Sequence, residues 1–357
     1  MTYDDGPIIT LPPRRPPLTI HIHGDIIMTF TFRRLGALVA ILALTLGTAR
    51  AQDDLAAQLS KLGAQAAPLY VSPLLNGFSV GMNSAFYHSA DLHGVLGFDV
   101  GVKIAAARVE DADKTFTLDL PATIVYNGTT FTRGTHYPDQ VTSQTAVGAK
   151  TTTDVKTIAP AGPGGAIPTG TTILTLPKGF DLPAVGAPFI PQVAVGLPFG
   201  LEVIGRFAPT MNAGDAGKFS YSGFGLRYDV DQWLPLFPID IAVHFGTQKM
   251  TFKDKADKDI FSASASAYGV EVSKGIIFLT VYGGFQLEGS EISVSDFVGY
   301  EPTTGAQVTV PGFTVEGKNK SRLTVGARML LLFLNVHAEY SVATTPVFAL
   351  GVGISFR

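Results

Sequence analysis

The chain has 357 residues, of which 15% are charged, 39 are glycine and none is cysteine, and its formal net charge is −3. This charge is too small to indicate a nucleic-acid partner, and no apolar run of about 18 or more residues follows residue 51, which excludes a membrane protein built from helices. A mean hydropathy of +0.27 in a glycine-rich chain without disulfides is instead typical of a transmembrane β-barrel or a secreted all-β protein.

The first 51 residues predict a leader and a signal peptide. Met28 is followed by the pair Arg33-Arg34, an apolar run over residues 35–46 and a small-residue site that ends at Ala51. A basic start, an apolar core of about 12 residues and an A-x-A site mark a secretory signal peptide, and this core is too short to span a membrane. We expect cleavage after Ala51 and translation from Met28; the alternative to this start is an unusually long leader.

Residues 52–93 predict a small, partly helical segment. Leucines recur at helical spacing between Asp53 and Ala67, two aspartates are placed to cap the start, and Pro68 is expected to end the helix. From Tyr70 to Leu92, prolines and glycines interrupt every pattern, which indicates irregular packed structure with at most one short strand.

From residue 94 to the end of the chain, the sequence predicts strands. Large apolar residues occupy every second position with small or polar residues between them, which is the pattern of a strand with two different faces. Most of these segments suit the about 9–11 residues of a tilted membrane-spanning strand better than the about 5–6 residues of soluble strands. The ten segments are 94–104, 192–197, 199–206, 223–230, 239–248, 268–273, 277–288, 322–329, 334–342 and 347–357.

The connectors between these segments differ in length in an orderly way. Outer-membrane barrels have short turns on the inner side and long loops on the outer side. Counting back from an inner C-terminus puts every connector on the expected side, apart from the short outer turn 344–346. The short connectors are 197–199, 231–238, 274–275 and 331–333, and the long or polar ones are 109–188, 208–217, 253–259 and 290–317.

The predicted fold class is therefore all-β, a transmembrane antiparallel up-and-down β-barrel over residues 94–357. Residues 52–93 are expected to form a plug, and the long outer loops are 109–188 and 290–317. We expect between about 10 and 14 strands, with 10 or 12 favoured, because closed barrels have an even number. Twelve strands would require an additional hairpin of residues 116–120 and 171–176.

The face opposite the apolar one lines the lumen of a barrel in lipid. The charged residues on this face have mixed signs, whereas ion-selective pores use rings of one sign, so we expect an ion-paired network in a narrow or plugged barrel. Many glycines on the same face indicate an occupied lumen, an open bore or only barrel curvature. The candidate lumen-lining residues are Asp99, Lys103, Glu202, Arg206, Arg227, Asp229, Glu271, Glu288, Arg322, Arg328, His337 and Glu339.

Signs of enzymatic chemistry are weak. His337 and Glu339 lie two residues apart on one strand face, but no serine in a nucleophile motif accompanies them. His88 and His93 are five residues apart, a spacing that fits no common metal site. We therefore expect no catalytic residue, no cofactor and no metal; a lipid-modifying barrel enzyme that uses His337 and Glu339 is kept as a further alternative.

The C-terminal strand, V-F-A-L-G-V-G-I-S-F-R, resembles the assembly signal of outer-membrane β-barrels. Here the last aromatic residue is penultimate, and Arg357 follows it. The resemblance implies that the barrel assembly machinery of the outer membrane binds this strand. The apolar residues that carry it are Phe348, Leu350, Val352, Ile354 and Phe356.

The layout of residues 53–357 also resembles the long-chain fatty acid transporter (FadL-like) superfamily. A helical and irregular N-terminal segment precedes a long outer loop and a proline-led hairpin over 189–207, and Asn83-Ser84-Ala85 is the nearest match to the Asn-Pro-Ala of that superfamily's plug. The sequence G-L-P-F-G-L-E at 196–202 is similar to a motif of an uncharacterised family of exported barrel proteins. The resemblance implies that a hydrophobic molecule enters among the outer loops and passes a plug by passive diffusion.

Two principal hypotheses of function follow from these observations. The first is an outer-membrane β-barrel that acts as a passive channel or transporter for small hydrophobic compounds. The second is a structural or surface-interaction barrel without transport, whose loops 109–188 and 290–317 bind a partner. In both hypotheses the barrel lies in the cell outer membrane and contacts its lipid and lipopolysaccharide.

Overall fold

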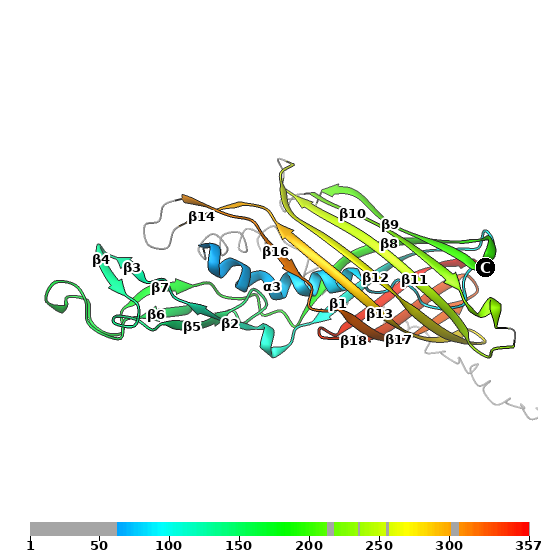
Figure 1. Cartoon of the computed structure of the whole chain (residues 1–357), viewed down its shortest axis with the longest axis horizontal. Helices are drawn as coiled ribbons and strands as arrows, with labels where there is room; N and C mark the ends of the chain where they lie inside the picture. The colour runs from blue at the N-terminus through cyan, green and yellow to red at the C-terminus, as the bar shows by residue number, and fades with distance from the viewer. Residues whose placement is uncertain (1–62, 213–217, 235, 255–256, 301–306, 357) are drawn as a thin grey trace, which may run out of the picture. The chain divides into compact units, whose positions relative to one another are not determined.

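The computed structural model describes residues 63–356, except 213–217, 235, 255–256 and 301–306. The predicted signal peptide, the start at Met28 and the cleavage after Ala51 lie outside these residues. Ten long strands pair antiparallel in a closed cycle that follows their order in the sequence (Figure 1). The predicted antiparallel up-and-down β-barrel is therefore confirmed, and the number of strands is ten.

The last strand closes the barrel on the first. Phe98 lies opposite Phe356, and the register continues without interruption to Ala107 opposite Val347. Because each of the ten strands has two neighbours, the barrel presents no free edge within the described residues. The strands are β1 (Phe98–Arg108), β8 (Ala184–Leu197), β9 (Leu201–Asn212), β10 (Lys218–Asp229), β11 (Asp240–Lys253), β12 (Asp259–Ile276), β13 (Leu279–Val294), β17 (Ser321–Leu331), β18 (Leu334–Val342) and β19 (Val347–Phe356).

The connectors define two ends of the barrel. We call the end with the long connectors the outer end and the end with the C-terminus of β19 the inner end. Strands reach farther toward the outer end than expected: the strand predicted over 268–273 begins at Asp259, and β9 continues into the predicted loop as far as Asn212. Serine and alanine alternate from Ser262 to Ala267, so this strand has two faces without the difference in hydropathy that would reveal them.

The connector between β1 and β8 forms an outer domain, defined here as residues 109–183. It contains three small pairings, β2 with β5, β3 with β4, and β6 with β7. The predicted hairpin of 116–120 and 171–176 is wrong, because Phe116 lies opposite Ser143 and Leu174 lies opposite Val155. The small strands are β2 (Thr115–Asp119), β3 (Thr123–Tyr126), β4 (Thr129–Thr132), β5 (Gln140–Gln144), β6 (Thr153–Lys156) and β7 (Thr172–Leu176), with short 3₁₀ turns η1 (Asp111–Asp113) and η2 (Pro163–Gly165).

The connector between β13 and β17 is shorter than predicted, because β13 continues to Val294. It contains β14 (Phe297–Tyr300), β15 (Gln307–Val310) and β16 (Phe313–Glu316). β14 pairs with β15, and β16 extends the barrel wall by pairing with the outer end of β13.

The helix α3 (Gly63–Met82) lies inside the outer end of the barrel, against β1 and β8. The expectation that the helix ends at Pro68 is wrong, since it passes through Pro68 and Pro73. Each proline removes one backbone hydrogen bond, but burial of the surrounding apolar side chains holds the helix, as tertiary packing often does. Tyr70 and Met82, for example, are fully buried. No helix in the described part of the chain has both the length and the apolar character required to cross a bilayer.

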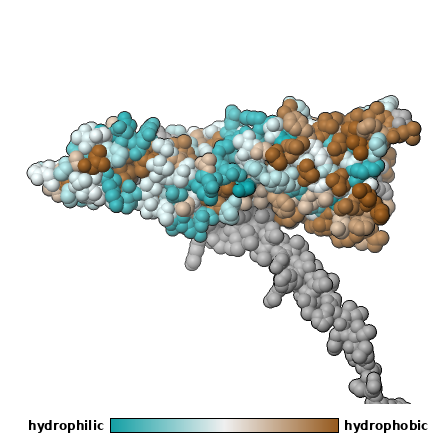
Figure 2. Space-filling model, turned by 90° about the horizontal axis from the view of Figure 1, so that it is seen from below, coloured by the Kyte–Doolittle hydropathy of each residue, from teal (hydrophilic) through white to brown (hydrophobic). Residues whose placement is uncertain are grey.

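The polarity of the barrel wall reverses along its length. On β12, Ser264 faces outward and Ala265 inward near the outer end, whereas Val270 faces outward and Glu271 inward near the inner end. The outer part thus encloses an apolar core around α3, and the inner part encloses polar groups behind an exposed apolar surface. Figure 2 shows this surface as a hydrophobic zone over the barrel strands. We call it the apolar belt; it is the pattern of a wall that faces lipid.

Candidate functional site

The lumen of the inner part is occupied by the chain itself. After α3 ends at Met82, residues 83–97, called the plug segment here, run through the barrel and emerge at its inner end before β1. Asn83 Nδ2 donates to the carbonyls of Ser266 and Gly289 at 3.2 and 3.3 Å, and the backbone N–H of Ala90 donates to Ser273 Oγ at 3.0 Å. The plug segment is thus bonded to the inner surface of the wall at several levels.

Arg227 and two carboxylates hold the inner half of the plug segment. Arg227 donates to Glu202 at 2.6 Å and to Glu271 at 2.7 Å, and its other nitrogen donates to the carbonyl of Ser89. Glu202 also binds His93, through the ring Nδ1 at 2.6 Å and the backbone N–H at 3.2 Å. All these side chains are at most 5% exposed. Removing one partner would leave an unpaired charge in the interior, which is strongly destabilising.

Two further arginines bind the C-terminal end of α3. Arg206 donates to the carbonyls of Met82 and Ser84, both at 2.9 Å, and its guanidinium lies 3.8 Å from the centre of the Phe86 ring. Arg322 donates to the carbonyl of Val80 at 2.7 Å. The last carbonyls of a helix lack partners within the helix and carry partial negative charge, so arginines here stabilise the end of α3. Arg322 also pairs with Glu288 at 2.8 Å.

A third group of residues surrounds Asn335 on β18. Its amide donates to Asp99 at 2.7 Å and lies 3.0 Å from His88 of the plug segment. The rings of His88 and His337 lie 4.7 Å apart. In the strand register Lys103, Gly351, His337 and Arg328 form one row across four strands, and a Cβ atom on Gly351 would come within 2.2 Å of the His337 ring.

Glycines on the inner face make room for the aromatic rings of the plug segment. A Cβ atom on Gly246 would lie 2.3 Å from the Phe86 ring, and one on Gly284 would lie 2.2 Å from the hydroxyl of Tyr87. No side chain larger than hydrogen fits at either position while these rings stay in place. Of the three interpretations of the inward glycines, an occupied lumen therefore describes these two positions.

The structure places eleven of the twelve candidate lumen-lining residues inside the barrel, each at most 7% exposed. Asp229 departs from the set, since it lies at the inner end of β10, is half-buried and accepts a bond from the backbone of Gln232. The charge-based list missed neutral partners of the same network. Among these are Ser84, Gln192 and Gln248, each of which accepts a hydrogen bond from Arg206 or Arg322. The two glutamines could have been found from the sequence, because both occupy inward positions on strands with alternating faces.

The geometry around His337 and Glu339 differs from that of a lipid-facing catalytic pair. Glu339 accepts bonds from the backbone of Ala85 and from the hydroxyl of Tyr282, at 2.8 and 3.2 Å. His337 is buried in the lumen, and its hydrogen bond is to Asn335 at 3.4 Å. Neither residue lies on the lipid side of the wall. Within the described residues, no group of three or more histidines and acidic residues could hold a metal ion.

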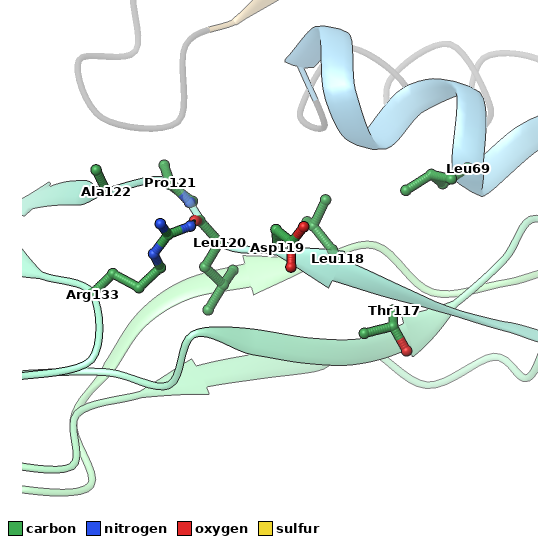
Figure 3. Close-up of a pocket in the computed structure, with 8 residues that line it drawn as sticks. All are labelled: Leu69, Thr117, Leu118, Asp119, Leu120, Pro121, Ala122 and Arg133. Carbon is green, nitrogen blue, oxygen red and sulfur yellow. The ribbon is translucent and has the colours of Figure 1, made fainter.

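A cavity of about 460 Å³ lies outside the lumen, between α3 and the outer domain. Figure 3 shows Leu69 projecting from α3 above the segment that carries most of the lining residues. Five of the eight lining residues are apolar, and the polar ones are Thr117, Asp119 and Arg133, which donates to the carbonyl of Leu120 at 2.7 Å. Its volume is in the range of small-molecule sites. The cavity is lined by Leu69, Thr117, Leu118, Asp119, Leu120, Pro121, Ala122 and Arg133.

Residues 31–356 match the model of a protein family described as "Family of unknown function (DUF6588)". No curated protein matches the sequence. Solved structures similar to the chain include the translocator domain of the autotransporter NalP from Neisseria meningitidis, with 9% identity, 83% of this chain and 99% of that chain covered, and a TM-score of 0.30.

Two further similar structures are OmpT, an outer membrane protein of Vibrio cholerae, and the CymD monoaromatic hydrocarbon channel. OmpT has 10% identity, 74% and 100% coverage of the two chains and a TM-score of 0.24. CymD has 9% identity, 84% and 98% coverage and a TM-score of 0.24.

Proposed function

The chain belongs to the DUF6588 family of unknown function, and we propose that it is an outer-membrane β-barrel closed by its own plug segment, which holds the outer domain at the cell surface for interaction with a partner. The observation that carries this proposal is the occupied lumen. Arg206, Arg227 and Arg322 each bind the plug segment or the end of α3 while also contacting the wall.

The outer domain supports the proposal because it has a folded core of its own. It buries side chains of its own, such as Phe131 and Tyr137, at 0% exposure. It is also attached to α3: the hydroxyl of Tyr70 donates to the carbonyl of Lys178 at 2.8 Å, and the backbone of Ala146 donates to the carbonyl of Tyr70 at 2.8 Å. A domain fixed in this way is suited to present a defined surface.

The outer-membrane location is proposed from the apolar belt and from the polar outward face of the strands between the belt and the outer end. Lys249 follows the belt residue Phe245 on the outward face of β11, and Lys253 lies farther along the same face. Such lysines would meet the phosphates of lipopolysaccharide above the apolar belt. Barrel assembly through the exposed apolar face of β19 belongs to the same proposal.

Passive transport of a small hydrophobic compound is the second candidate function. The cavity of about 460 Å³ beside α3 favours it, because a compound held there by Leu69, Leu118 and Leu120 would lie at the outer end of the plugged lumen. In this alternative the cavity captures the compound, and the plug segment must move before the compound can pass. The two functions differ in one respect that can be measured, which is whether solute crosses the barrel.

Conductance of the purified protein in planar bilayers tests the proposal. We expect no channel steps from the native protein, and channel steps from the variant Arg227→Ala, which releases both carboxylates and the plug segment. The control Arg133→Ala alters only the outer domain and should stay closed. Steady conductance of the native protein would contradict a closed lumen.

Uptake of a hydrophobic fluorescent fatty acid into liposomes tests the second candidate. Transport predicts uptake by the native protein and a marked loss when Leu118→Trp fills the outer cavity. Leu182→Trp, in the outer domain but outside the lining of the cavity, is the matched control. Absence of uptake by the native protein and both variants would exclude this probe as a substrate and favour the surface-interaction function.

A further inference from the structure

The turns at the inner end of the barrel carry large apolar side chains that are almost fully exposed. Their exposed fractions lie between 78% and 102%. We define the inner rim as these five residues, one from each of the four inner turns and one just before β1. They are Leu96, Phe199, Leu236, Ile277 and Leu332.

All five residues of the inner rim have a positive φ, between 56° and 74°. Glycine and asparagine are the usual residues at such positions, and a β-branched residue such as Ile277 is a clear outlier. Turns of the outer domain and outer end follow the usual preference, with Asn127, Gly128 and Asp257 at positive φ. The inner turns thus combine an unfavourable backbone conformation with exposed apolar side chains, and strain of this kind tends to cluster where it serves a function.

The height of the barrel wall explains why the inner turns carry exposed apolar side chains at positive φ. On β12, Tyr268 is the first large apolar outward residue after the serines and lies nine residues before Ile277. Lys274 also faces outward between them, and its Nζ donates to the carbonyl of Pro238 in the neighbouring inner turn. At about 3.3 Å per residue and a tilt of about 40°, the distance from Tyr268 to Ile277 is roughly 23 Å along the barrel axis. The apolar band of a membrane barrel is about 25 Å tall. The belt therefore reaches its full height only when the turn itself is included.

The side chains next to the rim continue the belt. Phe278 and Phe333, at the second positions of two inner turns, are 52% and 58% exposed. Trp233 is 71% exposed, and its ring N–H donates to the hydroxyl of Tyr228 at 2.7 Å. Tryptophan and tyrosine side chains, with one apolar and one polar end, are typical of the boundary between lipid and water.

We infer that the inner rim is immersed in the inner leaflet of the membrane and that its ligand is phospholipid. This inference rests on the membrane location proposed above and adds where the barrel ends within the bilayer. The short inner turns do not project into water but form the innermost part of the apolar belt. Apolar side chains at strained positions are tolerated there because lipid covers them. The inner mouth of the plugged lumen then opens at the level of the inner headgroups.

The chain contains a single tryptophan, Trp233, which makes a direct test possible. The native protein is reconstituted in phosphatidylcholine vesicles whose acyl chains carry bromine, which quenches tryptophan only within the bilayer, and in matched vesicles without bromine. Iodide in the buffer quenches tryptophan that is exposed to water. We expect Trp233 to lose at least half of its emission in brominated vesicles and to respond little to iodide.

Two variants on a Trp233→Phe background give the reference values. Tyr268→Trp places the reporter in the apolar belt and should be quenched by brominated lipid. Ile158→Trp, which is 52% exposed in the outer domain, should respond to iodide alone. Trp233 that behaves like the Ile158 reporter while the Tyr268 reporter is quenched would overturn the immersed rim and indicate a rim in water or covered by another protein. A Tyr268 reporter that is not quenched would overturn the membrane location itself.

Discussion

Arg227 on β10 and Glu202 on β9 form a buried ion pair of 2.6 Å, and the same carboxylate binds the ring of His93 in the plug segment at 2.6 Å. One carboxylate thus connects two parts of the chain that are 109 residues apart. The wall and the plug segment therefore share a network, and loosening one should loosen the other.

Removal of Arg227 should destabilise the folded barrel. Arg227→Ala leaves Glu202 and Glu271 buried without their cation, and breaking a buried pair of this kind costs about 3–5 kcal/mol. Urea unfolding in detergent micelles, followed by heat-modifiable gel mobility, measures the change. Lys218→Ala is the matched control, because its pair with Asp257 at 2.7 Å is exposed and contributes only about 0–1 kcal/mol. Equal stability of the two variants would show that the buried network does not hold the plug segment.

Gly246 and Phe86 should be energetically coupled. Gly246→Ala places a Cβ atom 2.3 Å from the Phe86 ring and should cost about 1–3 kcal/mol through overpacking. In the double variant with Phe86→Ala the added methyl group has space, so its cost should fall by more than about 1 kcal/mol. Gly205→Ala is the control, since a Cβ atom there meets nothing within 4 Å. Additive unfolding free energies would mean that the plug segment lies elsewhere in solution.

Much of the barrel was predictable because alternation is a direct consequence of strand geometry. Val270 faces outward and Glu271 inward for the same reason that Phe348 and Ala349 differ, namely that neighbouring side chains point to opposite faces. The continuation of β12 to Asp259 was not predictable, because alternating serine and alanine give both faces similar hydropathy. The part of helix α3 after Pro68 was missed because the rule for Pro68 is local, whereas the burial that outweighs it comes from strands far along the chain.

The network in the lumen was predictable in composition and not in detail. Eleven inward residues followed from the strand faces, but the partners of Arg206 and Arg322 are backbone carbonyls of α3, which no residue pattern reveals. Phe86 and Tyr87 were missed because their significance depends on Gly246 and Gly284 across the lumen. Such pairs become visible only when the register and the path of the plug segment are known.

An added charge should be costly in the middle of the apolar belt and should be tolerated beyond its outer edge. Val270→Arg, on the outward face of β12 within the belt, should cost about 2–4 kcal/mol in lipid vesicles. Ser264→Arg, six residues nearer to the outer end on the same face, should cost less than about 1 kcal/mol. Unfolding of both variants in vesicles and in detergent gives the comparison. If Ser264→Arg were as costly as Val270→Arg, the belt would have to extend beyond Tyr268, contrary to the reversal of polarity seen on β12.

Phe356 should matter more for assembly in the cell than for the stability of the finished barrel. Its ring stacks with that of Phe98 at a centroid distance of 6.0 Å, a contact that contributes about 0.5–1.5 kcal/mol. Phe356→Ala should therefore refold in detergent with a small loss of stability, while the amount of folded protein in the outer membrane should fall several-fold if the assembly machinery binds this end of β19. Phe348→Ala removes a similarly exposed ring from the other end of the same strand and is the matched control. Equal losses in the cell for both variants would show that recognition does not depend on the terminal aromatic residue, and a large loss in detergent for Phe356→Ala would assign its role to barrel closure instead.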